Sequence, residues 1–274
     1  MDQRPQDTMA RRLRAEDVLR ECGSVVVAFS GGVDSALVMA VAKQVLGDKV
    51  LAATAVSPSL PTGEMEEAIA LAEAVGVRHL LIETHEVERS DYSANTLDRC
   101  YFCKDTAYGV FTDLAAREGF GAVIDGTNAD DQGDHRPGRK AARQHGVRSP
   151  LAEGGLTKEE VRAWARELGL SAWDKPASAC LSSRIPYGSE VTPAKLGQIE
   201  RAEVALRALG FRQCRVRHHG PVARVEIEGP RLAEALAARE TIVARLKEAG
   251  FAYVTLDLEG FRSGSMNEVV GKTV

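Results

Sequence analysis

A turn between an apolar strand and a helix carries the residue types that bind phosphate. In the stretch Ala28–Ala40, AFSGGVDSALVMA, the chain leaves the apolar run through two consecutive glycines and enters a helical pattern at once. Glycine lacks a Cβ atom, so backbone N–H groups can approach an anion closely, and the helix dipole adds a favourable field. We therefore predict a phosphate site made by Ser30, Gly31, Gly32, Val33, Asp34 and Ser35.

Asp34 distinguishes this turn from a simple anion site, because a carboxylate repels phosphate unless it holds Mg²⁺ or caps backbone amides. Magnesium-bound pyrophosphate accounts for it, with Asp34 as a metal ligand. The stretch lacks the Gly-Lys-Ser/Thr ending of a Walker loop and the spaced glycines of a dinucleotide fingerprint. A purely structural turn with an aspartate cap is the alternative, and the specific residue types at each position of SGGVDS weigh against it.

A second polar loop follows another apolar strand, in the stretch Ile124–Gly138, IDGTNADDQGDHRPG. Its amide and carboxylates suit the orientation of Mg²⁺, ribose or substrate. A solvated turn with an Asx cap is the alternative for each aspartate. From this loop we predict ATP contacts by Gly126, Asn128 and Asp131, with Asp130 and Asp134 as neighbouring acids.

Cys180 lies in KPASACLSSRIPYG, a stretch rich in Ser, Pro and Gly between two patterned regions. Small neighbours would leave its sulfur accessible, and the cation Arg184 follows closely, which favours the thiolate. A single cysteine is more often an inert, small apolar residue. The surrounding loop favours a chemical role here.

Two further cysteines, Cys100 and Cys103, have the spacing of a metal chelate or a redox pair in DRCYFCK. A zinc site would need Cys180 and Cys214 to complete four ligands. A redox pair lacks its usual setting after a first strand. A third hypothesis is a [4Fe–4S] cluster on Cys100, Cys103 and Cys180, with its fourth iron open to sulfide. The spacing leaves all three open.

Strand alternation in FRQCRVRHHGPVARVEI predicts that Arg215 and Arg217 share one face. Guanidinium groups bind phosphate oxygens in pairs, so this face, together with Arg184, is predicted to hold a substrate phosphate. Solvated surface arginines are the alternative. Glu203, on the preceding helix, is a candidate for metal or ligand contact.

These residues need a scaffold, and the first part of the chain alternates short apolar runs with helical patterns, as in an α/β fold with a doubly wound parallel sheet. Ligands then bind where strand carboxyl ends meet helix N-termini. The predicted strands are 24–29, 50–56, 77–83 and 122–125, and the predicted helices are 35–46, 62–75, 104–118 and 157–168, the first three ended by Gly47, Gly76 and Gly119.

The pattern changes after the cysteine-bearing loop, which predicts a smaller C-terminal α+β domain. We place the domains at residues 1–176 and 177–274. The predicted elements of the second are a helix over 193–209, capped by Thr192, a hairpin of strands 211–218 and 222–227, a helix over 231–248 and a strand over 251–258.

Composition describes an ordinary globular chain: 274 residues, 44% apolar, 27% charged and a formal net charge of −4. That charge argues against binding to nucleic acid or to membrane surfaces. The first twenty residues read as neither a secretory signal nor an anchor, and five cysteines fit reduced thiols, so we expect the cytoplasm. We also expect a small-molecule substrate and a homo-oligomer.

The motif SGGVDS resembles the PP-loop of ATP pyrophosphatases, which include asparagine, NAD and GMP synthetases and thiouridine synthetases. Together with CYFCK, GTNADD, HRPG, SACLSSRIPYG and GFRSGSMNE, it resembles the ATP-dependent sacrificial sulfur transferases (the LarE family) that build the nickel-pincer cofactor of lactate racemase. The resemblance spans nearly the whole chain. It implies ATP and Mg²⁺ as requirements and the other enzymes of nickel-pincer cofactor synthesis as partners.

The resemblance also implies a reaction: adenylation of a pyridinium dicarboxylate mononucleotide, then sulfur delivery to give a thiocarboxylate. Cys180 matches the family's sulfur donor, which attacks the acyl adenylate, loses its sulfur and becomes dehydroalanine. Cys100 and Cys103 are a departure from the sacrificial pattern, because with Cys180 they could support cluster-bound sulfide instead. An amide-forming PP-loop ligase, a tRNA thiolase and an ATP-binding carrier without catalysis are the competing hypotheses.

Overall fold

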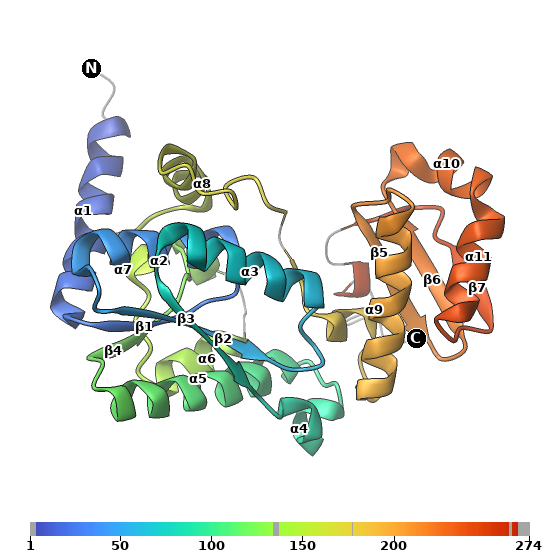
Figure 1. Cartoon of the computed structure of the whole chain (residues 1–274), viewed down its shortest axis with the longest axis horizontal. Coiled ribbons are helices and arrows are strands. Elements are labelled where there is room, and N and C mark those ends of the chain that lie inside the picture. The colour runs from blue at the N-terminus through green and yellow to red at the C-terminus, as the bar shows by residue number, and fades with distance from the viewer. Residues whose placement is uncertain (1–3, 134–136, 177, 263–264, 268–274) are drawn as a thin grey trace. The chain divides into compact units, whose positions relative to one another are not determined.

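The computed structural model describes residues 4–133, 137–176, 178–262 and 265–267 (Figure 1). The chain forms two compact units. The first contains Met1–Glu86 and Asp98–Ser178, and the second contains Val87–Leu97 and Ala179–Val274. The segment Val87–Leu97 thus belongs with the C-terminal residues, although a single division of the sequence assigned it to the first domain.

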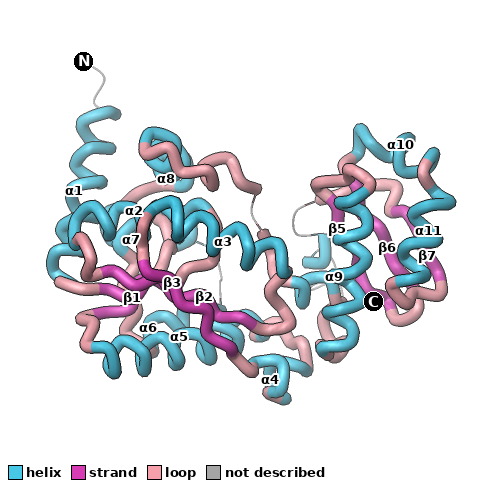
Figure 2. Tube along the Cα trace, in the orientation of Figure 1, coloured by secondary structure: helices cyan, strands magenta, loops and turns pink. Residues whose placement is uncertain are grey.

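A four-stranded parallel sheet forms the centre of the first unit, drawn in magenta in Figure 2. The strand order is β3-β2-β1-β4, and Val25 of β1 pairs with Val50 of β2 and Ala122 of β4. From β1 the chain adds β2 and then β3 on one side, and later adds β4 on the other side of β1. The strand order therefore reverses between β1 and β4. The bounds are β1 Val25–Ala28, β2 Val50–Val56, β3 Arg78–Glu83 and β4 Ala122–Ile124.

Helices cover both faces of this sheet (Figure 1). Val25 and Val27 point into one apolar core with α2 and α8, while Val26 points into the other with α5 and α6. This alternation explains the continuous apolar run of β1, since both of its faces are buried. The fold class predicted from the sequence is confirmed. The helices are α1 Arg4–Cys22, α2 Val33–Leu46, α3 Thr62–Val75, α5 Arg99–Glu118, α6 Pro137–Gln144, α7 Pro150–Gly154 and α8 Lys158–Glu167.

Local signals explain most of these boundaries. Helix α8 begins with a complete capping box, in which Thr157 and Glu160 satisfy each other's backbone N–H groups. Gly76 ends α3 in the left-handed conformation. The sequence-based start of α5 was wrong: the helix begins at Arg99, so Cys100 and Cys103 lie in its first turns. Helix α1 was not predicted, because it has no regular apolar stripe.

The second unit has a three-stranded sheet in the order β5-β6-β7. Strands β5 and β6 form the predicted hairpin, and β7 pairs with β6 in parallel. The predicted helix over 231–248 is wrong as a single element, because Ala238 separates α10 from α11. The bounds are α4 Ser90–Ser93, α9 Pro193–Ala208, β5 Cys214–His219, β6 Val222–Ile227, α10 Leu232–Ala237, α11 Arg239–Glu248 and β7 Tyr253–Leu256.

Candidate functional site

The SGGVDS turn lies at the point where the strand order of the parallel sheet reverses. Gly31 has φ of 71°, and a Cβ atom there would lie 3.0 Å from the Cβ of Ala68, so the position suits glycine on both counts. The Ser35 hydroxyl donates to the Gly32 carbonyl at 3.0 Å and lies 3.1 Å from the Ser30 hydroxyl. Both predicted hydroxyls therefore converge inside the turn.

The loop after β4 passes directly against this turn. A Cβ atom on Gly126 would lie 2.5 Å from the Ser35 backbone nitrogen, so no larger residue fits there. The close approach allows the Asn128 side chain to donate to Asp34 at 3.1 Å. Asp131 instead accepts from the Asn128 backbone N–H at 3.1 Å, which stabilises its own loop. The structure thus brings together three of the predicted site residues, Asp34, Gly126 and Asn128, whereas Asp134, His135 and Arg136 lie outside the described residues.

Lys158, which was not singled out from the sequence, forms an ion pair with Asp34. Its backbone N–H also donates to Asp130 at 2.8 Å, so the start of α8 is joined to the acidic loop. The capping box marks Lys158 as the first residue of a helix, but nothing local indicates which turn that helix end faces. Lys158 therefore places a cation beside the SGGVDS turn.

Lys175 is a second cation at this turn, with its Nζ 3.5 Å from the Gly31 carbonyl. It forms ion pairs with Glu64 at 2.6 Å and Glu67 at 2.7 Å. Burial favours the neutral amine, but the hydrogen bonds to both carboxylates outweigh it and raise the pKa of Lys175. The lysine stays charged, and the carboxylates hold it at the turn.

Cys180 lies in the second unit, at the start of a short 3₁₀ turn, Leu181–Arg184. The cysteine is partly exposed, while Leu181 and Ser182 are fully buried beneath it. The Tyr92 and Ser182 hydroxyls lie 2.7 Å apart, and the Asn95 amide donates to the carbonyls of Pro186 at 2.8 Å and Ser189 at 2.9 Å. The turn is therefore anchored to Val87–Leu97, while the Cys180 side chain stays partly exposed.

Arg184 and Glu203 form a buried ion pair next to this turn. Both nitrogens of the guanidinium fork reach the carboxylate, Nε to Oε1 at 2.9 Å and Nη2 to Oε2 at 3.0 Å. Burial alone would raise the pKa of Glu203, but the charge and hydrogen bonds of Arg184 outweigh it and lower the pKa. Glu203 is thus an anion at neutral pH, with its two oxygens bonded to Arg184.

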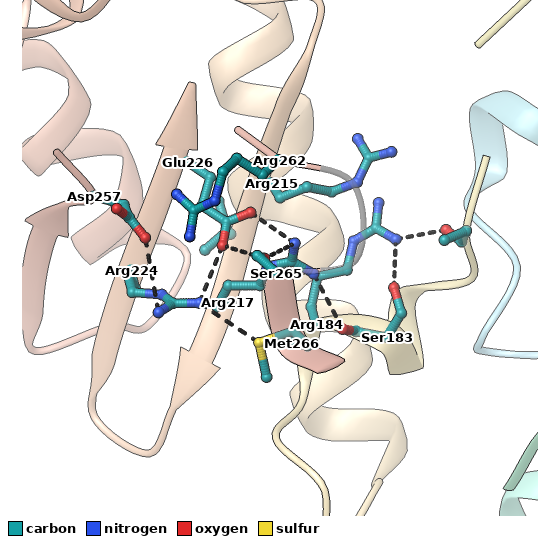
Figure 3. Close-up of polar contacts among 12 residues, drawn as sticks. Ser183, Arg184, Arg215, Arg217, Arg224, Glu226, Asp257, Arg262, Ser265 and Met266 are labelled. Atoms are coloured by element: carbon teal, nitrogen blue, oxygen red, sulfur yellow. Dashed lines mark hydrogen bonds and ion pairs between the residues drawn. The ribbon is translucent and has the colours of Figure 1, made fainter. Parts of the chain in front are cut away.

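Arg215 and Arg217 share one face of β5, as the alternation predicted (Figure 3). Arg217 pairs with Glu226 at 2.6 Å and donates to Ser265 at 2.9 Å, yet its buried Nε has no partner among the described residues. No ion pair of Arg215 with a carboxylate is found among them, and its guanidinium stacks on Phe261 at 5.1 Å. Burial, and then the charge of Arg184, lower the pKa of Arg215. A bound anion would offset the burial of the Arg215 charge and would give the Arg217 Nε a hydrogen-bond partner.

The remaining cysteines differ sharply in their surroundings. Cys100 is exposed and Cys103 is partly exposed on α5 of the first unit, whereas Cys214 is fully buried in the second. Burial, and then Glu203, raise the pKa of Cys214 to about 12, so its thiol is protonated at neutral pH. Within the part of the chain that is described, no group of three or more His, Cys, Asp or Glu side chains gathers as a metal site.

The parallel sheet and the SGGVDS turn at its reversal point define an ATP-dependent enzyme of the PP-loop class. Residues 9–104 match the family model described as NAD synthase, which belongs to this class. A pyridinium-3,5-bisthiocarboxylic acid mononucleotide synthase from Lactiplantibacillus plantarum is 42% identical over 255 residues, covering 93% of this chain and 92% of that protein. The chain belongs to the family of this synthase.

Two further relatives are similar to the chain over nearly its whole length. A protein from Synechocystis, slr1717, is 47% identical over 254 residues, covering 92% of this chain and 95% of the relative. A protein from Methanocaldococcus jannaschii, MJ0830, is 28% identical over 239 residues, covering 87% and 91%. Among the described residues, no helix is both long enough and apolar enough to cross a membrane.

Proposed function

We propose that the chain is an ATP-dependent sulfur transferase that converts a carboxylate of a pyridinium-3,5-dicarboxylate mononucleotide into a thiocarboxylate for the nickel-pincer cofactor. The observation that carries this proposal is the similarity, over 93% of the chain, to the synthase of the bisthiocarboxylic acid mononucleotide. The phosphate turn in one unit and the accessible Cys180 in the other supply the two chemistries that such a reaction needs. The product would pass to other enzymes of cofactor synthesis, and we propose a homo-oligomer acting in the cytoplasm.

The first step is adenylation. A carboxylate oxygen of the substrate attacks the α-phosphorus of ATP, the bond between that phosphorus and the bridging oxygen breaks, and pyrophosphate leaves. Backbone N–H groups of Gly31–Ser35 and the Ser30 and Ser35 hydroxyls would hold the leaving pyrophosphate. Lys158 and Lys175 would balance its charge, with Mg²⁺ held by Asp34 once Lys158 moves to the phosphates. Gly126, Asn128 and Asp131 would shape the nucleotide side of the site.

The second step is sulfur transfer. The Cys180 thiolate attacks the acyl carbon of the adenylate, AMP leaves, and a thioester joins the substrate to the protein. A base then removes the Cα proton of residue 180 while its Cβ–S bond breaks. The sulfur and the electron pair of that bond leave as the thiocarboxylate, and dehydroalanine remains in the chain. Cys180 is the fitting donor because its thiol is partly exposed on a turn that hydrogen bonds hold in place.

The substrate phosphate would bind at Arg215 and Arg217. Arg215 carries a charge that burial and Arg184 disfavour, and Arg217 has a buried Nε without a partner, so both have reason to accept an anion. Arg184 was also predicted here from the sequence, but its guanidinium is bonded to Glu203 and to the carbonyls of Ala179 and Cys180.

A second sulfur source is proposed because Cys100 and Cys103 lie three residues apart at the start of α5, with Cys100 exposed. Residues at this spacing share one helix face and can chelate one group. The two thiolates, together with Cys180, would hold a [4Fe–4S] cluster, which supplies an open iron site for external sulfide. In that case Cys180 would remain intact.

Mass spectrometry of protein and product distinguishes the two sources. The chain is incubated with ATP, Mg²⁺ and the pyridinium dicarboxylate mononucleotide. Sacrificial donation predicts that the protein loses about 34 mass units at residue 180, one for each sulfur found on the product. Thiolated product with an unchanged protein mass supports the cluster. An amide product with ammonia would indicate a ligase, and absence of pyrophosphate with this carboxylate would refute the proposal.

A further inference from the structure

We propose that Arg184 is a positioning residue, which holds the backbone on both sides of Cys180 so that the thiol meets the acyl adenylate, and that Glu203 holds Arg184 in turn. This inference rests on the proposed function, in which Cys180 attacks the activated substrate. It assigns Arg184 a role other than phosphate binding.

Almost all hydrogen-bond donors of the Arg184 guanidinium are already used within the second unit. Its Nη1 donates to the carbonyl oxygens of Ala179 at 2.5 Å and Cys180 at 2.9 Å, and to the Ser183 hydroxyl at 3.0 Å. Its Nε and Nη2 are bonded to Glu203. A guanidinium has five N–H groups, so at most one is left for a phosphate. Arg215, which has no carboxylate partner among the described residues, contrasts with this.

Glu203 connects the pair to the core of the second unit. Its side chain is fully buried on α9, and Oε1 also accepts from the Val216 backbone N–H of β5 at 3.1 Å. Because the carboxylate is bonded to a strand and carried by a helix, it cannot move without disturbing both. Arg184 therefore links the carbonyls of Ala179 and Cys180 to the core of the second unit through hydrogen bonds.

The far side of the turn is held independently. Arg217 donates to the Ser183 carbonyl at 3.1 Å (Figure 3). The buried Tyr92 hydroxyl lies 2.7 Å from that of Ser182. With the backbone fixed from both sides, the position of the Cys180 sulfur depends mainly on rotation about its Cα–Cβ bond. Nucleophilic attack needs the reacting atoms at about 3–3.5 Å, and a displacement of ~1 Å can slow it about 100-fold.

The test separates the two half-reactions in Arg184→Lys and Arg184→Gln. We expect pyrophosphate release and the KM for the pyridinium substrate to stay within about twofold, while single-turnover sulfur transfer falls about 100-fold. Arg231→Gln, which removes the Arg231–Glu234 pair from the same unit, is the matched control and leaves both steps unchanged. A raised KM with intact sulfur transfer would show Arg184 to be a phosphate ligand and overturn the proposal.

Glu203→Gln provides an independent variant. Positioning predicts slower sulfur transfer at unchanged KM, because the amide cannot hold the guanidinium fork. A phosphate role predicts the opposite, a lower KM, because Arg184 is released toward the substrate.

Hydrogen exchange tests the inference without any turnover, and so separates its failure from failure of the proposed function. The Ser183 amide donates to the Cys180 carbonyl at 3.0 Å in the wild-type turn. We expect its exchange to be at least tenfold faster in Arg184→Lys than in Arg231→Gln. Equal protection in the two variants would refute positioning, whether or not the wild-type chain makes thiocarboxylate.

Discussion

The chemistry of individual side chains here follows from what surrounds each of them. Cys180 and Cys214 are the same residue type in the same unit, yet one is partly exposed and the other is fully buried with a pKa of about 12. Arg184 and Arg215 differ in their partners: Arg184 is bonded to a carboxylate, whereas Arg215 has no carboxylate partner among the described residues. From residue type alone, the two cysteines would be equally good candidates for a chemical role, and so would the two arginines.

Lys158 gives a prediction at this scale. We expect Lys158→Ala to slow pyrophosphate release by about 100-fold or more, because the cation proposed to stabilise the leaving group is lost. The measurement is pyrophosphate release under saturating ATP and Mg²⁺. Lys43→Ala, which removes an exposed ion pair with Asp48 from α2, is the control and keeps its rate. A Lys158→Ala rate equal to that of this control would contradict a role for Lys158 in adenylation.

Among elements, helix α1 depends on residues far along the sequence. Glu160 accepts hydrogen bonds from Thr8 at 2.7 Å and Arg11 at 3.0 Å, while Arg12 pairs with Glu167. One carboxylate thus closes the capping box of α8 and binds α1 to it. Burial alone would raise the pKa of Glu160, but the Thr157 backbone, Thr8 and Arg11 outweigh it and lower the pKa to about 2.

The lowered pKa of Glu160 predicts a pH dependence of stability. The ordinary pKa of a glutamate is 4.5, so the stabilising contribution of Glu160 is complete above that pH and is lost as the pH falls toward 2. We expect Glu160→Gln to reduce the free energy of unfolding at pH 7 and to converge on the wild type as the pH approaches 2. Denaturant unfolding across this range, with the exposed Glu66→Gln as control, measures it. A difference independent of pH would exclude the carboxylate charge as the cause.

At the scale of the whole molecule, the two candidate sites belong to different units. The phosphate turn, Lys158 and the Gly126 loop lie in the first, and Cys180 with its arginines lies in the second. The chain crosses between the units after Glu86, after Leu97 and after Ser178. The segment Val87–Leu97 packs with the turn that carries Cys180, and along the chain it is followed by α5 of the first unit.

This division predicts separate ligand footprints. We expect Mg²⁺-ATP alone to slow amide exchange about tenfold around Gly31–Ser35, and the pyridinium mononucleotide alone to slow it around Arg215 and Arg217, because the two proposed binding sites lie in different units. Hydrogen exchange with each ligand in turn measures both. Protection of β5 by ATP alone would contradict the assignment of the phosphate sites. Cys180→Ser should leave both footprints unchanged while abolishing sacrificial sulfur transfer.

The sequence by itself determined the parallel-sheet class, and it predicted the phosphate turn and an accessible Cys180. These features are local: apolar runs with glycine stops mark strands and helices, and SGGVDS carries its donors within six consecutive residues. The alternation that put Arg215 and Arg217 on one strand face is equally local. Asp34 and Asn128 each follow an apolar strand in the sequence, but their contact with each other was not predicted and comes from the structure.

Tertiary structure alone decided which partners these residues have. Lys158 meets Asp34 across 124 residues, and Glu160 meets Thr8 across 152. The docking of α1, the place of Val87–Leu97 and the pairing of Arg184 with Glu203 depend on the same kind of contact. Hydrophobic burial fixes how helices and sheet pack, and only that packing brings charges from distant segments within bonding distance, so spacing along the chain could not reveal them.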